Sequence, residues 1–219
     1  MTPDLDPSPR EGQRGLGYLM LVILVATVGG FLFGFDTMIW TGAQLSLEKH
    51  FNLSEAALGF AASSVMIGAL SGTFSAAIVS DFMGRKKTMM MAAVLFMLSA
   101  IGTALPHSIV VFDVFRTLGG IGIGLAMVIS PVYIAEISPR HIRGRLVTFN
   151  QIIIVFGSIV AMGLDTYVTY KVRDDNLTWR ILFGAECVPI VVFIIGLFSF
   201  REARAIWLRR TAKTRPSGF

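Results

Sequence analysis

Two charged residues, Asp36 and Arg116, lie inside long apolar stretches of the sequence. At the centre of a membrane-spanning helix either charge costs at least about 2.5 kcal/mol, so each is a candidate functional residue. Each lies about eight residues of helix, or roughly 12 Å, from the end of its stretch at the outer membrane surface, so the two share a depth. An ion pair would offset the burial of both charges, and protonation of Asp36 would break it. Such a pair could couple a proton to a conformational change.

Two other arrangements fit the same residues. The pair could be static and only hold two helices together. Alternatively Asp113, one helical turn before Arg116, could take the place of Asp36 as its partner. Asp36 would then be unpaired within an apolar helix.

Polar residues also mark one face of the stretch 146–170. Gln151 and Ser158 are seven residues apart, which places them on the same side of a helix. Gln151 both donates and accepts hydrogen bonds and so suits a hydroxyl-rich ligand, although an interhelical hydrogen bond is the simpler role. Phe33, one turn before Asp36, could stack on a sugar ring or merely pack. We take Phe33, Gln151 and Ser158 as candidate substrate-binding residues.

A third group of charges lies in short polar turns between apolar stretches. Its members are Asp81, Gly84, Arg85, Glu136 and Arg143. Opposite charges at helix ends can form a latch that must open when the helices move. Isolated exposed ion pairs contribute only about 0–1 kcal/mol, so ordinary loop charge is the alternative.

The elements that must position these residues are six apolar stretches, because a membrane-spanning helix needs about 20 mainly apolar residues. The composition agrees, with 54% hydrophobic and 15% charged residues. We predict an all-α polytopic membrane protein, a six-transmembrane-helix bundle over 16–200, with a disordered head at 1–15 and a basic tail at 201–219. The predicted spans are 16–45, 56–80, 88–106, 108–137, 146–170 and 179–200. Gly68 with Gly72, and Gly120 with Gly124, have the small-xxx-small spacing that lets helices approach closely in lipid.

The distribution of positive charge predicts the orientation. With the head inside, fourteen of the 19 Lys and Arg residues lie in inner segments, four lie outside, and Arg116 lies within a span. Cytoplasmic loops collect Lys and Arg, so both termini are predicted to be cytoplasmic, in a bacterial-type inner (plasma) membrane. The net charge of +5 could indicate a protein that binds nucleic acid, but this distribution of the charges argues against it. The bilayer is the expected partner.

Other classes of function find little support. Cys187 is the only cysteine, and the three histidines are isolated in predicted loops, so neither a metal site nor a cofactor is expected. No nucleophile and base are spaced for catalysis, which argues against an enzyme.

Several motifs resemble the sugar porter family of the major facilitator superfamily. They are spread over about 185 residues, and the fourth-helix block is the most specific. The matching segments are Gly30–Thr37, Asp81–Lys87, Arg116–Gly124, Pro131–Glu136, Pro139–Gly144, Phe149–Gln151 and Trp179–Arg180.

The resemblance implies a role for each matching residue. Asp36 matches the carboxylate that family symporters use for proton coupling, with Arg116 as its partner, and facilitative members typically lack this acid. Gln151 matches a sugar-binding residue and Phe33 an aromatic near the sugar. Ser158 stands where a proton-linked member has a second sugar-binding Gln. Asp81, Arg85, Glu136 and Arg143 match a charge network that holds the outward-open state, although Phe82 replaces the family's Arg in that loop.

Family members have twelve helices, and this sequence has six predicted ones. The resemblance therefore implies the amino-terminal half of a proton-coupled symporter for a pentose or hexose. Such a half would work with a second six-helix bundle, either its own copy or a separate half, around a site near the middle of the membrane. The alternative is a truncated membrane protein that does not transport.

Overall fold

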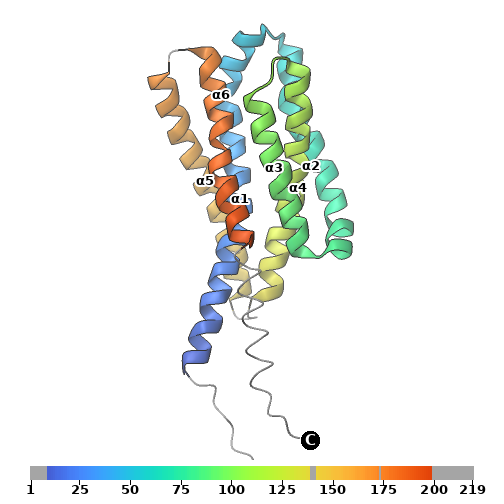
Figure 1. Cartoon of the computed structure of the whole chain (residues 1–219), viewed down its shortest axis with the longest axis vertical. Coiled ribbons are helices and arrows are strands. Elements are labelled where there is room, and N and C mark those ends of the chain that lie inside the picture. The colour runs from blue at the N-terminus through green and yellow to red at the C-terminus, as the bar shows by residue number, and fades with distance from the viewer. Residues whose placement is uncertain (1–8, 139–141, 173, 199–219) are drawn as a thin grey trace, which may run out of the picture.

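The computed structural model describes residues 9–138, 142–172 and 174–198, which form six long helices and no strand (Figure 1). A helical segment, 187–198, follows the sixth helix after one turn residue. The all-α prediction is confirmed. The helices are α1 (Pro9–Phe51), α2 (Glu55–Met83), α3 (Arg85–Ala104), α4 (Ile109–Ile137), α5 (Arg143–Lys171) and α6 (Asp175–Ala185).

Five helical segments in the described chain are long and apolar enough to cross a membrane. The remaining predicted span, 16–45, lies within α1, which is 43 residues long. The bundle also exposes large apolar side chains, such as Phe74 and Ile78 at 79% and 74% exposure. A soluble protein rarely leaves so much apolar surface open, whereas a lipid-facing helix requires it. The five segments are Glu55–Met83, Arg85–Ala104, Ile109–Glu136, Arg143–Lys171 and Asn176–Phe198.

The ends of the helices differ from the predicted spans. α1 begins at Pro9, so residues 9–15 of the predicted disordered head are helical. Proline suits the first position of a helix, where its missing N–H is not needed. Residues 1–8 and the predicted tail 201–219 lie outside the described residues.

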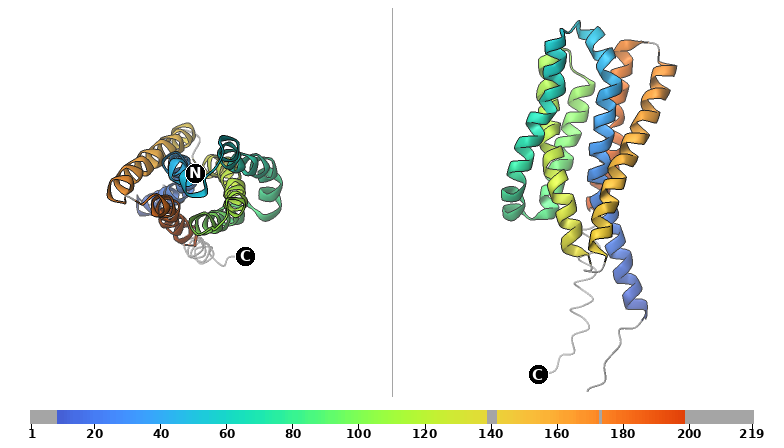
Figure 2. Two further views of the ribbon diagram at one scale, coloured as in Figure 1. Left: turned by 90° about the horizontal axis from the view of Figure 1, so that it is seen from above. Right: turned by 180° about the vertical axis from the view of Figure 1, so that it is seen from behind.

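The helices form two groups of three that lie side by side (Figure 2). α2, α3 and α4 make one group, and α1, α5 and α6 make the other, with α1 also packing on α4 and α3 on α6. α2 and α4 cross with their backbones in contact. A Cβ atom added at Gly68 would meet the carbonyl oxygen of Thr117, and one at Gly120 would meet that of Val65. The predicted packing role of the small-xxx-small pairs is confirmed.

The sixth span is interrupted near its middle. α6 ends at Ala185, Glu186 forms a turn, and the helix resumes over 187–198. Pro189 explains the break, because it has no N–H to donate to the Ala185 carbonyl and its ring crowds that carbonyl. The break places Glu186 inside the bundle, where it is 5% exposed.

Candidate functional site

Asp36 on α1 and Arg116 on α4 form a buried ion pair. Arg116 Nη1 donates a hydrogen bond to Asp36 Oδ1, and the two side chains are 2% and 11% exposed, in the order Arg116 and Asp36. The shared depth inferred from the sequence thus corresponds to direct contact. Asp113 lies one turn from Arg116 but is not its hydrogen-bonding partner here.

Two aromatic rings flank the guanidinium group of Arg116. Its Cζ atom lies 5.4 Å from the centre of the Trp40 ring on α1 and 5.4 Å from that of Phe183 on α6. A cation over an aromatic face gains about 0.5–2 kcal/mol, more when water is excluded. The rings therefore help to stabilise the positive charge of Arg116 away from water. Its N–H groups can still donate hydrogen bonds to acceptors.

Glu186 is a third buried ionisable group at this site, and the sequence reasoning missed it. Its carboxyl group is within hydrogen-bonding reach of Asp36 and also interacts electrostatically with Arg116. Asp36 and Glu186 therefore share one cation, the guanidinium group of Arg116. The signal was present in the sequence, since Glu186 is a carboxylate inside the predicted span 179–200.

The three candidate sugar-binding residues are not brought together by any contact with one another. The Ser158 hydroxyl lies 3.1 Å from the Gly34 carbonyl oxygen on α1 and 3.3 Å from that of Ile154, so its hydrogen is engaged in helix packing. Gln151 is exposed on α5. Phe33 is half-buried and packs against the core that α1 shares with α3 and α4. The amide of Gln151 is thus the side chain of the three best placed for a ligand outside the bundle.

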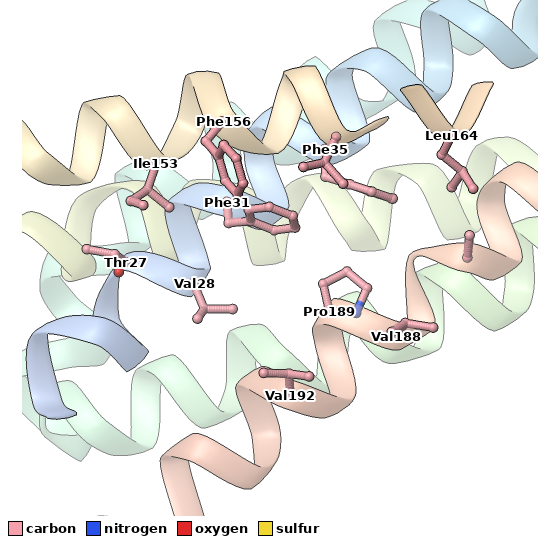
Figure 3. A pocket seen from close by; sticks show the side chains of 12 residues that line it. Thr27, Val28, Phe31, Phe35, Ile153, Phe156, Leu164, Val188, Pro189 and Val192 are labelled. Atoms are coloured by element: carbon pink, nitrogen blue, oxygen red, sulfur yellow. The ribbon is translucent and has the colours of Figure 1, made fainter. Parts of the chain in front are cut away.

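A groove of about 550 Å³ lies between α1, α5 and the sixth span around its break (Figure 3). Its walls are apolar apart from Thr27, and Phe31, Phe35 and Phe156 contribute much of them. Sugar recognition requires several hydrogen-bonding side chains, which this groove does not offer. It is therefore distinct from the predicted sugar site, and its walls resemble the lipid-facing surface around it.

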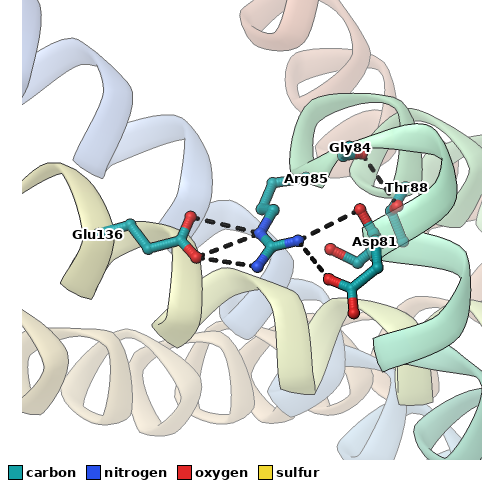
Figure 4. Close-up of polar contacts among 6 residues, drawn as sticks. Asp81, Gly84, Arg85, Thr88 and Glu136 are labelled. Carbon is teal, nitrogen blue, oxygen red and sulfur yellow. Dashed lines mark hydrogen bonds and ion pairs between the residues drawn. The ribbon is translucent and has the colours of Figure 1, made fainter.

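The second predicted cluster forms where α2 turns into α3 (Figure 4). Arg85 lies between Asp81, 2.9 Å from its Nη1 atom, and Glu136 on α4, 3.0 Å from its Nη2 atom. The Arg85 Nε atom also donates to Glu136, so this contact is bidentate, which favours strength and a fixed geometry. Arg143, predicted to join the network, is exposed and forms no ion pair with these three residues in the described part of the chain.

Gly84 makes the tight turn that places Asp81 and Arg85 together. It is both the C-cap of α2 and the N-cap of α3, with φ +85° and ψ +153°. Residues other than glycine rarely adopt this backbone conformation, which costs them about 1–3 kcal/mol.

Gly84→Ala is expected to lower the free energy of unfolding by about 1–3 kcal/mol through backbone strain alone, because an added Cβ meets nothing within 4 Å. Thermal unfolding in detergent followed by circular dichroism measures the change. Gly144→Ala, at another open position, is the control. Equal melting temperatures of the two variants would show that alanine at position 84 introduces no backbone strain.

The fold and the buried pair define one half of a major facilitator transporter. The chain aligns with a solved proton:xylose symporter of that superfamily bound to 6-bromo-6-deoxy-D-glucose, with TM-score 0.80 and 35% identity over 84% of this chain and 45% of that one. A partially occluded inward-open structure of the E. coli xylose transporter gives TM-score 0.79 and 36% identity, covering 83% of this chain and 50% of that one.

The chain belongs to the sugar porter family. The model of the family described as "Sugar (and other) transporter" matches residues 22–215. A glucose transport protein of Synechocystis is 39% identical over 90% of this chain and 44% of its own length. The D-xylose-proton symporter of E. coli K12 is 36% identical over 92% of this chain and 47% of its own length. The chain therefore spans about half the length of these relatives, both of which are transporters.

Proposed function

We propose that this chain is the amino-terminal bundle of a proton-coupled monosaccharide transporter, acting with a second six-helix bundle in a bacterial inner membrane. The observation that carries the proposal is the ion pair of Asp36 and Arg116, buried between two membrane-crossing helices. Protonating Asp36 removes the attraction that joins α1 to α4 at this point. The carboxyl group is therefore the proton-coupling residue and Arg116 the partner that responds to it.

The substrate proposal rests on the relatives and on α5. Relatives that carry glucose or xylose indicate a hexose or a pentose. In this reading Gln151 hydrogen-bonds the sugar from the exposed face of α5, Phe33 borders the site, and Ser158 contributes acceptor lone pairs while its hydrogen holds Gly34. The second bundle supplies the opposite wall, since transporters of this kind bind substrate between their repeats.

The cytoplasmic cluster is proposed to be a latch that closes the inner side. Asp81, Arg85 and Glu136 link the turn between α2 and α3 to the end of α4. Arg143, just beyond the undescribed residues 139–141, would join the latch in another state of the transport cycle. In this orientation both termini are cytoplasmic, which agrees with the excess of Lys and Arg in the inner segments.

Uptake into proteoliposomes tests the proposal. The chain is reconstituted alone, and also with the carboxy-terminal half of the E. coli D-xylose-proton symporter, and labelled xylose and glucose are offered under an imposed pH gradient. Gradient-driven accumulation of one sugar is expected, and Asp36→Asn is expected to abolish it because the amide takes up no proton. Asp174→Asn, at the exposed cap of α6, is the control that keeps uptake.

Absence of uptake in both reconstitutions would overturn the proposal. The chain would then be a membrane protein of this family that does not transport. Accumulation that persists in Asp36→Asn would separate transport from the proposed coupling residue.

A further inference from the structure

We propose that Asp113 is a second acceptor for Arg116, and that it receives the guanidinium group when Asp36 is protonated. The inference rests on the proposed function and adds the residue that holds the released charge. Two atoms suggest it: Arg116 Nε and Asp113 Oδ1 are both buried and have no hydrogen-bond partner among the described residues. One is a donor and the other an acceptor, and residues three apart on a helix are neighbours.

Leaving these two atoms unpaired is costly. A buried donor or acceptor without a partner costs about 1–3 kcal/mol, and more when the group is charged. Rotation about the Arg116 side-chain bonds would satisfy both atoms at once, because they lie one turn apart on α4. In the state described here the Nη1 atom of the same guanidinium group is held by Asp36 instead.

Protonation of Asp36 removes the negative charge that holds the guanidinium group of Arg116 in this position. The guanidinium group stays charged in any functional pH range, so it needs another anion. With Arg116 only 2% exposed, an uncompensated charge would cost several kcal/mol. Trp40 and Phe183 stabilise the cation but carry no negative charge. Asp113 supplies one within the reach of a side-chain rotation.

The position of Asp113 has a mechanical consequence. Asp36 lies on α1, so its ion pair joins α1 to α4, whereas a pair between Asp113 and Arg116 is internal to α4. Passing the guanidinium group from Asp36 to Asp113 therefore releases α1 while the charge on α4 stays balanced. The released state can then move without a buried charge that lacks a partner.

The other ionisable groups near Arg116 do not offer the same arrangement. Glu186, in the turn after α6, is in contact with Asp36, and pairing with it would tie α4 to another element. Asp165 on α5 lies against Gly42 and accepts a hydrogen bond from Thr169. The ionisable residues of α2 and α3 occur only at the ends of those helices. The other acid on α4, Glu136, is at the far end of the helix and pairs with Arg85, so Asp113 is the acid of α4 that lies one turn from Arg116.

The test measures protonation and not transport. The full chain, with 13C-labelled aspartate carboxyl groups, is placed in lipid nanodiscs and titrated by nuclear magnetic resonance, with the Asp36 signal assigned by its loss in Asp36→Asn. Asp113→Asn is expected to lower the midpoint pH of Asp36 protonation by about one unit, a tenfold change in proton concentration. Asp113→Glu, which keeps the charge, should retain the wild-type midpoint, and Asp165→Asn is the matched control.

A second readout follows Arg116 itself. In Asp36→Asn, which imitates the protonated state, the 15N signal of Arg116 Nε is expected to shift as it bonds Asp113. The shift should be absent from the double variant Asp36→Asn/Asp113→Asn. An Asp36 midpoint in Asp113→Asn equal to that in Asp165→Asn would overturn the inference. A chain that carries no sugar still titrates, so this failure is distinct from failure of the proposed transport.

Discussion

Arg116→Met is expected to lower the free energy of unfolding of the bundle by about 3–5 kcal/mol, the range measured when one partner of a buried ion pair is removed. Methionine fills similar space between the rings of Trp40 and Phe183 but leaves Asp36 and Glu186 buried without a cation. Unfolding by sodium dodecyl sulfate in mixed micelles, followed by circular dichroism, measures the loss.

The double variant Asp36→Asn/Arg116→Met shows whether the loss comes from charge or from packing. It removes both charges, and apolar or neutral replacements of whole buried pairs are often tolerated. Most of the stability should therefore return. Arg143→Met, at an exposed arginine, is the control and should change stability by no more than about 0.5 kcal/mol. Losses that simply add in the double variant would exclude an interaction between the two residues.

Gly120→Ala is expected to lower the free energy of unfolding by about 1–3 kcal/mol, because the added methyl group overlaps the Val65 carbonyl of α2. The two helices must separate to accommodate it, and the backbone contact along the small-residue face is lost. The same detergent unfolding experiment measures the change.

Gly163→Ala is a control that is expected to raise the free energy of unfolding, not lower it. Gly163 lies within α5, and a Cβ added there meets nothing within 4 Å. Alanine favours a helix over glycine by about 0.5–1 kcal/mol, so this variant should be slightly more stable than the wild type. If both variants were equally stable, the close approach of α2 and α4 would not limit stability.

Hydropathy predicted the six helices well but not their ends. It identifies the apolar portion of a helix, whereas capping groups decide where the helix starts. The Ser54 hydroxyl accepts a hydrogen bond from the Ala57 N–H at the start of α2, and the Asp174 carboxylate accepts one from Asn176 at the start of α6. These caps extend both helices beyond the predicted spans into polar sequence.

The candidate site was predictable only in part. A common depth was enough to pair Asp36 with Arg116, because both charges need compensation in an apolar layer. The contact of Glu186 with Asp36 depends on how α6 packs against α1, which residue spacing does not contain. Periodicity likewise placed Ser158 on a face of α5 but did not identify its neighbour. That neighbour is the Gly34 carbonyl, reached because α1 and α5 touch at a glycine.

The break in the sixth span makes one part of the bundle easier to bend than the rest. A continuous helix resists flexing because bending stretches hydrogen bonds, but Pro189 has already removed the bond that would cross this point. The portion before the break, α6, is anchored, since Arg180 donates to the carbonyl groups of Ala104 and Pro106. A change in tilt would therefore move the portion after the break, 187–198, about a hinge at Glu186. A change in the contacts of Glu186 would therefore act directly on the angle between the two portions.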